Sequence, residues 1–318
     1  LGDVYKRQYM EGISWFAFDP KSNFDIMYIS SAALGPVRKV NFANETVEFL
    51  SHISYSTERP TIITWTPDEN QDMVVTRDLS SSGNVNIVYS RASGFTTKVD
   101  LESTLGKLKS GNAAMIHPDG QLYYTAYYTQ DIYRYDFATK ETTIASKHVK
   151  TKENLRLVLH PSGKYAYMMR LYYSGNNSGY IARLDYDDEA KTFGTPYIVA
   201  GSDGSAGYAD GVGSTVRMRG PGQGVFVKNP DYAGEEDEYD FYFTDDYNNC
   251  VRVLTPTGRV YTFAGRGNDI ADGGYADGAL RTEARFDRPW AIAYDEKREC
   301  FYVGERNNKV IRKIALEE

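Results

Sequence analysis

The residues best suited to bind a ligand are tyrosines, arginines and carboxylates at the ends of short apolar stretches. Tyrosine and tryptophan offer a flat apolar face with a polar tip, and arginine and carboxylates offer forked hydrogen bonds. This mixture suits a sugar, whose ring stacks on an aromatic face while its hydroxyls form hydrogen bonds. We therefore predict a ligand-binding face that contains Arg77, Tyr128, Arg170, Tyr173, Asp245, Tyr247, Trp290, Glu305 and Arg306. Replacing Trp290 or Arg306 with Ala should weaken binding and leave the melting temperature nearly unchanged. Entrances to neighbouring strands add Arg59, Arg156, Arg219 and Arg288.

Some of these positions also offer catalytic chemistry. A hydrolase or lyase acting on a glycan or lactone could draw its acid and base from Asp78, Asp245, Asp246 and Glu305. Two of these carboxylates would have to converge at about 5–10 Å over a pocket. No Gly-x-Ser-x-Gly motif supports a serine nucleophile. The leading hypothesis is therefore a non-catalytic binding protein, and the enzyme is the alternative.

Two groups of potential metal ligands have a structural interpretation. Calcium requires six to eight oxygen ligands, and the aspartates available in glycine-rich loops are Asp203, Asp210, Asp272 and Asp277. We expect these aspartates to cap turns, because no Asp-x-Asp-x-Asp-Gly loop is present. His117 and His160 each precede a Pro-x-Gly turn, without the further converging ligands that zinc needs. We predict no metal and no cofactor, with calcium at the loop aspartates as the minor alternative.

Composition excludes several classes of protein. The chain has 318 residues with 36 Lys+Arg and 43 Asp+Glu, which gives a formal net charge of −7. This balance disfavours a nucleic-acid binder, and no apolar run reaches the ~18 residues of a membrane span. Cys250 and Cys300 fall near opposite ends of their strands, so we predict that they stay unpaired. The 27 Tyr and 28 Gly favour an all-β chain of short strands and tight turns.

The elements that position these residues repeat along the chain. Six units of about four strands have first strands that begin near residues 13, 61, 113, 155, 222 and 289. A unit of this length is the signature of a propeller blade. We predict an all-β, six-bladed β-propeller, with four antiparallel strands per blade and a single domain over residues 13–318. Five candidates lie at or just after second strands at equivalent offsets: Arg77, Tyr128, Tyr173, Tyr247 and Arg306. Trp290 begins a first strand, and we expect all six residues to surround one mouth of the central channel.

The last blade is incomplete at the C-terminus, because its unit supplies only three strands. Its outer strand must come from the N-terminus, at Val4–Met10, or be absent. Residues 1–12 lack the turn residues of the other units. They are interpreted as a leader that is either non-native or the closing strand.

Two loops connect the chain with a known family. Both contain Gly-Tyr-Ala-Asp-Gly, at 207–211 and 274–278, and lead to Arg219-Gly220-Pro221 or Arg288-Pro289-Trp290. Residues 197–318 resemble the NHL-repeat family of six-bladed propellers. They are similar in particular to the propeller part of exported Bacteroidetes proteins in which an immunoglobulin-like (IPT/TIG) domain precedes the propeller. Gly304-Glu305 departs from the family's Ala-Asp, and the first four units lack the loop.

The resemblance implies an exported protein of the periplasm or outer cell surface that helps to capture nutrients, often glycans. Its ligand would be an oligosaccharide or another small molecule, and an immunoglobulin-like domain would lie upstream. A third class, a surface that binds protein or RNA, is known among NHL domains. RNA binding would need a contiguous basic face, which the acidic balance disfavours.

Overall fold

The computed structural model of the chain consists almost entirely of short β-strands. It describes residues 2–5, 11–31, 35–79, 83–108, 111–126, 129, 131–147, 155–170, 178–267 and 273–315. Helical structure in these residues is limited to three-residue 3-10 turns at Arg91–Ser93 (η1), Gly213–Thr215 (η2), Pro230–Tyr232 (η3) and Asp246–Asn248 (η4).

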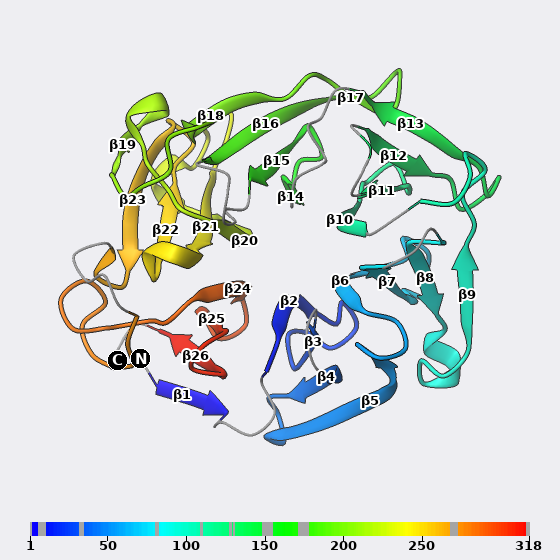
Figure 1. Ribbon diagram of the computed structural model, residues 1–318, viewed down its shortest axis with the longest axis horizontal. Coiled ribbons are helices and arrows are strands. Elements are labelled where there is room, and N and C mark those ends of the chain that lie inside the picture. The colour runs from blue at the N-terminus through cyan, green and yellow to red at the C-terminus, as the bar shows by residue number, and fades with distance from the viewer. Residues whose placement is uncertain are drawn as a thin grey trace. The chain divides into compact units, whose positions relative to one another are not determined.

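The first three antiparallel sheets are each built from four consecutive strands (Figure 1). The first sheet contains β2 (Ile13–Phe18), β3 (Ile26–Ser31), β4 (Pro36–Asn41) and β5 (Thr46–Ser54). The second contains β6 (Pro60–Trp65), β7 (Met73–Arg77), β8 (Asn86–Tyr89) and β9 (Lys98–Leu101). The third contains β10 (Gly111–Ile116), β11 (Leu122–Ala126), β12 (Ile132–Tyr135) and β13 (Thr142–Ser146).

The fourth and fifth sheets each gain a short additional strand. The fourth has the order β14 (Leu155–Leu159), β15 (Tyr165–Arg170), β16 (Gly179–Asp187) and β17 (Thr192–Phe193), and β18 (Tyr197–Ser202) also pairs with β16. The fifth has the order β20 (Pro221–Lys228), β21 (Tyr239–Asp245), β22 (Cys250–Leu254), β23 (Arg259–Ala264) and β19 (Gly211–Val212).

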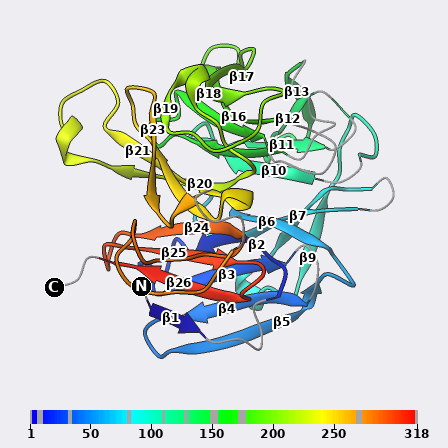
Figure 2. The same cartoon turned by 60° about the vertical axis from the view of Figure 1, so that its left-hand side comes forward.

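The sixth sheet takes its outer strand from the N-terminus. It contains β24 (Pro289–Asp295), β25 (Cys300–Glu305), β26 (Val310–Ile314) and β1 (Gly2–Tyr5). β1 pairs antiparallel with β26, with Gly2 opposite Lys313 and Tyr5 opposite Ile311 (Figure 2). The closing strand comes from the N-terminus and shares Val4 and Tyr5 with the expected Val4–Met10, of which residues 6–10 lie outside the described chain.

The predicted fold class is confirmed: the protein is an all-β, six-bladed β-propeller. First strands begin at residues 13, 60, 111, 155, 221 and 289, within two residues of the expected positions. The chain forms two compact units, which are described separately. Unit 1 contains Leu1–Ile13, Met168–Arg183 and Tyr197–Glu318, and unit 2 contains Ser14–Tyr167 and Leu184–Pro196. The single domain over 13–318 stays a prediction.

Apolar side chains from successive sheets form the core within each unit. In unit 1, Val251 of β22 packs in one cluster with Ile292 of β24 and Val303 of β25, and all three are fully buried. In unit 2, Val37 of β4 and Met73 of β7 share a similar cluster. Each large apolar side chain that is fully buried contributes about 1.5–3 kcal/mol. A single sheet would leave its apolar side chains exposed to water, so neighbouring sheets stabilise one another.

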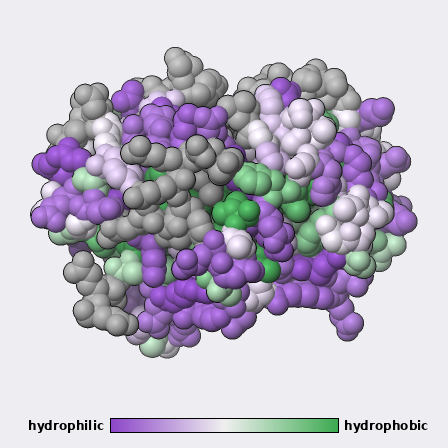
Figure 3. Space-filling model, turned by 90° about the horizontal axis from the view of Figure 1, so that it is seen from below, coloured by the Kyte–Doolittle hydropathy of each residue, from purple (hydrophilic) through white to green (hydrophobic). Residues whose placement is uncertain are grey.

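In the part of the chain that the structure describes, no helix is long and apolar enough to cross a membrane. The described residues on the face drawn in Figure 3 are mostly hydrophilic, with small hydrophobic patches between them.

Candidate functional site: an arginine–aromatic cluster

Three of the residues predicted to bind ligand come together in unit 1, at strand ends of the fifth and sixth sheets. Tyr247 lies in η4 directly after β21, Trp290 is the second residue of β24, and Arg306 follows β25. Two arginines that precede β20 and β24, and one aspartate of η4, complete the group. We call the following six residues the arginine–aromatic cluster: Arg219, Asp246, Tyr247, Arg288, Trp290 and Arg306.

The same backbone connection positions the cluster in both sheets. The amide of Asp246 donates to the carbonyl of Gly220 over 3.0 Å, and the equivalent amide of Arg306 donates to the carbonyl of Arg288 over 3.0 Å. Each bond holds the residues after a second strand beside the residue that precedes the first strand. Arg288 adopts a left-handed backbone conformation with φ of 58°, which is uncommon for a residue with a side chain. Its amide donates to Oδ1 of Asn249 over 2.9 Å, which stabilises this conformation.

A forked ion pair forms the buried base of the cluster. Arg288 Nε and Nη2 donate to Oδ1 and Oδ2 of Asp246 over 2.6 and 2.7 Å. Asp246 is completely buried, and burial raises the pKa of its carboxyl although the contact with Arg288 opposes that shift. The Arg288 guanidinium carbon lies 3.6 Å from the centre of the Tyr247 ring, and that of Arg219 lies 5.6 Å from it. The Tyr247 ring is therefore within cation–π range of two guanidinium groups.

Trp290 and Arg306 form the second stacked pair of the cluster. The Arg306 guanidinium carbon lies 3.9 Å from the Trp290 ring centre, and Trp290 is only 8% exposed. Among the described residues, no side chain forms a hydrogen bond or ion pair with the Arg306 guanidinium. Burial lowers the pKa of Arg306, and nearby Arg288 lowers it further while Asp246 opposes both effects. Arg306 thus keeps hydrogen-bond donors that no described side chain uses.

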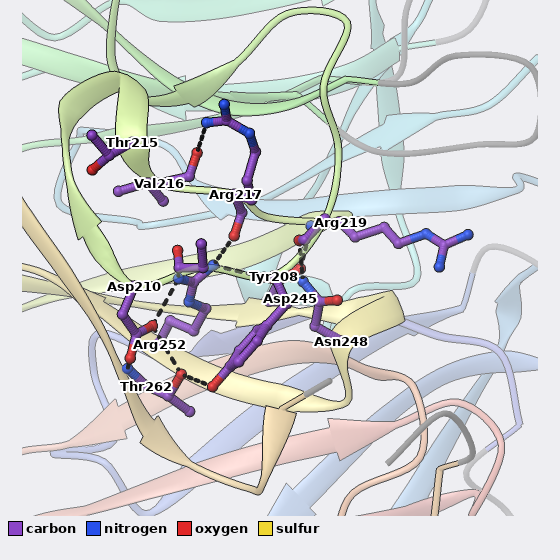
Figure 4. Close-up of polar contacts among 12 residues, drawn as sticks. Tyr208, Asp210, Thr215, Val216, Arg217, Arg219, Asp245, Asn248, Arg252 and Thr262 are labelled. Carbon is purple, nitrogen blue, oxygen red and sulfur yellow. Dashed lines mark hydrogen bonds and ion pairs between the residues drawn. The ribbon is translucent and has the colours of Figure 1, made fainter. Parts of the chain in front are cut away.

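Asp245 was predicted to face the ligand, and this prediction is wrong because its carboxylate is completely buried. It accepts hydrogen bonds from Arg252 over 3.1 Å, from the Asn248 side chain over 2.8 Å and from the amide of Arg219 over 2.8 Å. Figure 4 shows these donors around the carboxylate, with the side chain of Arg219 directed away from it. Asp245 is therefore a structural ion-pair partner.

Glu305 requires the same correction. It is completely buried and accepts from Arg312 over 2.9 Å, from the Asn308 side chain over 2.6 Å and from the amide of Asp287 over 2.6 Å. Burial raises the pKa of Glu305 to about 7, although the amide of Asp287 and Arg312 oppose the shift. Neither Glu305 nor Asp245 reaches solvent, so neither can contact a ligand in this conformation.

The Gly-Tyr-Ala-Asp-Gly loops explain why these two buried ion pairs look alike. Arg252 donates to the carbonyl of Ala209 over 2.7 Å and to Asp210 over 2.8 Å (Figure 4). Arg312 donates in the same way to the carbonyl of Ala276 over 2.8 Å and to Asp277. Both arginines are completely buried. Each loop therefore encloses an arginine of the third strand of its blade.

Asp210 and Asp277 are thus counter-ions of buried arginines, whereas the sequence analysis expected them to cap turns. Asp203 also has a partner, because the Ser178 hydroxyl donates to it over 2.6 Å. Asp272 lies outside the described residues. Within the described residues, no group of three or more His, Cys, Asp or Glu side chains is arranged to hold a metal.

Two of the remaining predicted residues lie in the described part of the chain. In unit 2, Arg77 forms ion pairs with Glu58 over 2.9 Å and Asp100 over 3.3 Å. Arg170 is buried in β15. Tyr128 and Tyr173 lie outside the described residues.

The candidate residues also do not share one offset. Pro60, Pro221 and Pro289, each the first residue of a first strand, lie opposite Arg77, Asp245 and Glu305 respectively. Arg77 is thus equivalent to the two buried carboxylates, whereas Arg306 is equivalent to Asp246. The expected equivalence of Arg77 and Arg306 is wrong by one residue, which turns a side chain to the opposite face of a strand.

The histidines and cysteines have structural surroundings. His117 Nε2 lies 2.8 Å from the carbonyl of Gly163, and the His160 ring stacks on Tyr165 at 4.3 Å between centres. Cys250 and Cys300 are buried and unpaired, as predicted.

The sequence analysis missed the two buried arginines, Arg252 and Arg312. A signal for them was present, because each is a charged residue within an apolar strand and follows a carboxylate by seven residues. A charge at that position needs a buried partner.

No protein-family model matches the chain, so the NHL assignment stays a prediction. A curated protein, SUPPRESSOR OF QUENCHING 1 of Arabidopsis thaliana, is 35% identical over 108 residues, which are 34% of this chain. The matched stretch is only 9% of that protein's length, so its activity is not transferred.

Two solved structures match almost the whole chain. One is described as an auxiliary nutrient binding protein from Bacteroides ovatus, with 41% identity, a TM-score of 0.87 and coverage of 98% of this chain and 70% of that one. The other is described as a candidate phosphatase from Bacteroides thetaiotaomicron, with 30% identity, a TM-score of 0.87 and coverage of 97% and 72%. The first similarity is high in identity and extends over most of both proteins. The chain therefore belongs to the same family as the Bacteroides proteins described as auxiliary nutrient binding proteins.

Proposed function

We propose that the protein is a non-catalytic, ligand-binding β-propeller of the cell envelope that captures a nutrient saccharide at the arginine–aromatic cluster. The observation that carries the proposal is the placement of Arg288 at strand ends of two adjacent sheets, where its guanidinium stacks on Tyr247 and its carbonyl accepts from the amide of Arg306. Guanidinium groups supply forked donors, and the tyrosine supplies a flat face with a polar tip. Residues from two blades can thus contact one small ligand.

The family relationship supports capture of a nutrient, because a relative is described as an auxiliary nutrient binding protein. The envelope location and the upstream immunoglobulin-like domain are parts of the proposal that rest on the NHL resemblance. Glycan as the nutrient rests on the aromatic and arginine side chains of the cluster.

The burial and ion pairing of the candidate carboxylates favour a binding protein over an enzyme. An acid–base pair needs two carboxylates that reach the substrate. In unit 1, Asp245, Asp246 and Glu305 are completely buried, and each is bound to an arginine. These three candidates for a hydrolase or lyase thus act as counter-ions of arginines.

A thermal-shift screen with soluble polysaccharides and oligosaccharides tests the proposal, followed by calorimetry and chromatography of the recovered ligand. We expect at least one saccharide to raise the melting temperature and to be recovered unchanged. Tyr247→Ala should weaken its binding about 5- to 10-fold, since the stacking face is lost. Tyr197→Ala, which removes an exposed tyrosine of β18 in the same unit, is the control. No binding across the panel, or cleavage of the bound saccharide, would contradict the proposal.

A further inference from the structure

In the arginine–aromatic cluster, one carboxylate forms an ion pair with one arginine and leaves Arg306 without a described acidic side chain in contact. Asp246 directs both carboxylate oxygens to Arg288, over 2.6 and 2.7 Å. Arg306 lies near this pair but stacks on Trp290, at 3.9 Å from its ring centre. In the described part of the chain, Asp246 neutralises Arg288 while Arg306 has no acidic partner in contact. The cluster therefore presents a positive charge beside a pair that is already neutral.

The surroundings of Arg306 make this charge costly in the absence of an anion. Burial lowers the pKa of Arg306, and the neighbouring guanidinium of Arg288 adds to that effect. Stacking on Trp290 covers one face of the guanidinium, but it leaves the N–H donors in the plane of the group unused. A planar donor set of this kind matches the oxygens of a carboxylate or a sulfate.

The position of Trp290 makes Arg306 the residue presented to a ligand. Trp290 is 8% exposed, and the Arg306 guanidinium lies over the face of its ring. The role of Trp290 is thus to hold the guanidinium in place. Tyr247 is more exposed than Trp290, and its ring contacts Arg288, the ion-pair partner of Asp246. Arginine held on an aromatic ring is pre-ordered, so less conformational entropy is lost on binding.

Resting on the proposed function, we infer that the saccharide bound at the cluster is anionic, with a carboxylate or sulfate group that the Arg306 guanidinium binds. The sugar ring lies against Tyr247, and the anionic group replaces water at the N–H donors of Arg306. The net charge of −7 makes the rest of the chain unfavourable to such a ligand. The local positive charge of the cluster therefore selects where it binds.

The test is calorimetry with three probes on the full chain: an oligogalacturonate, a neutral galacto-oligosaccharide of equal length, and a sulfated galactan oligosaccharide. We expect an acidic probe to bind at least about tenfold more tightly than the neutral one, as for a charge-assisted hydrogen-bond pair. Its affinity should also fall as salt is raised, while that of the neutral probe stays constant. Whether the carboxylate or the sulfate probe binds more tightly identifies the anionic group.

Two substitutions of Arg306 and one control substitution locate the effect. Arg306→Met keeps an apolar side chain over Trp290 and should abolish the preference for the acidic probe, while Arg306→Lys should retain part of it. Arg259→Met removes an exposed arginine of β23 in the same unit and should leave the preference unchanged. Melting temperatures establish that each variant is folded.

The outcomes separate the inference from the proposed function. Equal binding of acidic and neutral probes overturns the inference and leaves saccharide capture standing. An unchanged preference in a folded Arg306→Met variant also overturns it. Inorganic sulfate and galacturonate monomer serve as control ligands, and binding of either one as tightly as the oligosaccharides would overturn the inference, because the anion alone would then be recognised. Failure of every saccharide to bind removes both the inference and the proposed function.

Discussion

Arg252→Met removes the centre of the buried network of the fifth sheet. The arginine is completely buried and donates to the carbonyls of Arg217 and Ala209, over 2.6 and 2.7 Å, and to Asp210 and Asp245. Methionine fills similar space but supplies no donor. Breaking one partner from a buried pair costs about 3–5 kcal/mol, because the other charge stays buried without compensation.

The expected change in melting temperature follows from the size of the chain. Unfolding entropy is about 2.1 cal/mol/K per residue, so for 318 residues the loss lowers the melting temperature by about 5–8 °C at pH 7.5. Burial already raises the pKa of Asp245, and loss of Arg252 raises it further. The folded variant then binds a proton that the unfolded chain releases, so lowering the pH toward 5 should recover part of the lost stability.

Scanning calorimetry at pH 5, 6 and 7.5 measures this effect, with Arg259→Met as the matched control. Combining Arg252→Met with Asp245→Asn should recover stability relative to Arg252→Met alone, since the unpaired charge is then absent. A loss below about 1 kcal/mol, or a loss that does not change with pH, would refute the description of this network as a buried ion pair.

Three further predictions concern unit 1. The raised pKa of Glu305, about 7, exceeds its ordinary value, so its contribution to stability falls as pH rises from about 4.5 to about 7. Glu305→Gln should flatten the dependence of unfolding free energy on pH in that window, and an unchanged slope in thermal unfolding would contradict this. Trp290→Ala should lower the free energy of unfolding by about 3–5 kcal/mol, because Trp290 is nearly buried. This differs from the expectation from sequence that the melting temperature stays nearly unchanged, and a fall in melting temperature of less than one degree would restore that expectation. Burial raises the pKa of both Cys250 and Cys300, so a thiol reagent should label neither in the native protein and both after denaturation, and rapid native labelling would exclude the buried placement.

The fold was predictable because propeller blades repeat a period of apolar strands and turns. The starts of the first strands and the outer strands, such as Thr46–Ser54 and Arg259–Ala264, follow directly from that period. β1 was harder to place, because its partner β26 lies at the other end of the chain. A strand that pairs across the whole sequence leaves no local pattern.

The candidate site was only partly predictable for a physical reason. Counting from the apparent ends of the second strands gave Arg77 and Arg306 equivalent positions. In the structure, Pro60 lies opposite Arg77 whereas Pro289 lies opposite Glu305, so Arg77 and Arg306 differ by one residue in register. Register irregularities near these prolines change which side chains face outward. Sequence also gives no measure of burial, and burial is what separates Glu305 from the exposed carboxylates that could meet a ligand.

Hydrogen–deuterium exchange with and without the saccharide that binds most tightly is the most direct test of the arginine–aromatic cluster as the binding site. We predict slower exchange at residues 217–222, 245–249, 287–291 and 305–309 when the ligand is bound, and no change at 229–238, a loop of the same unit outside the cluster. Protection confined to other segments, with these four unchanged, would contradict the assignment of the site.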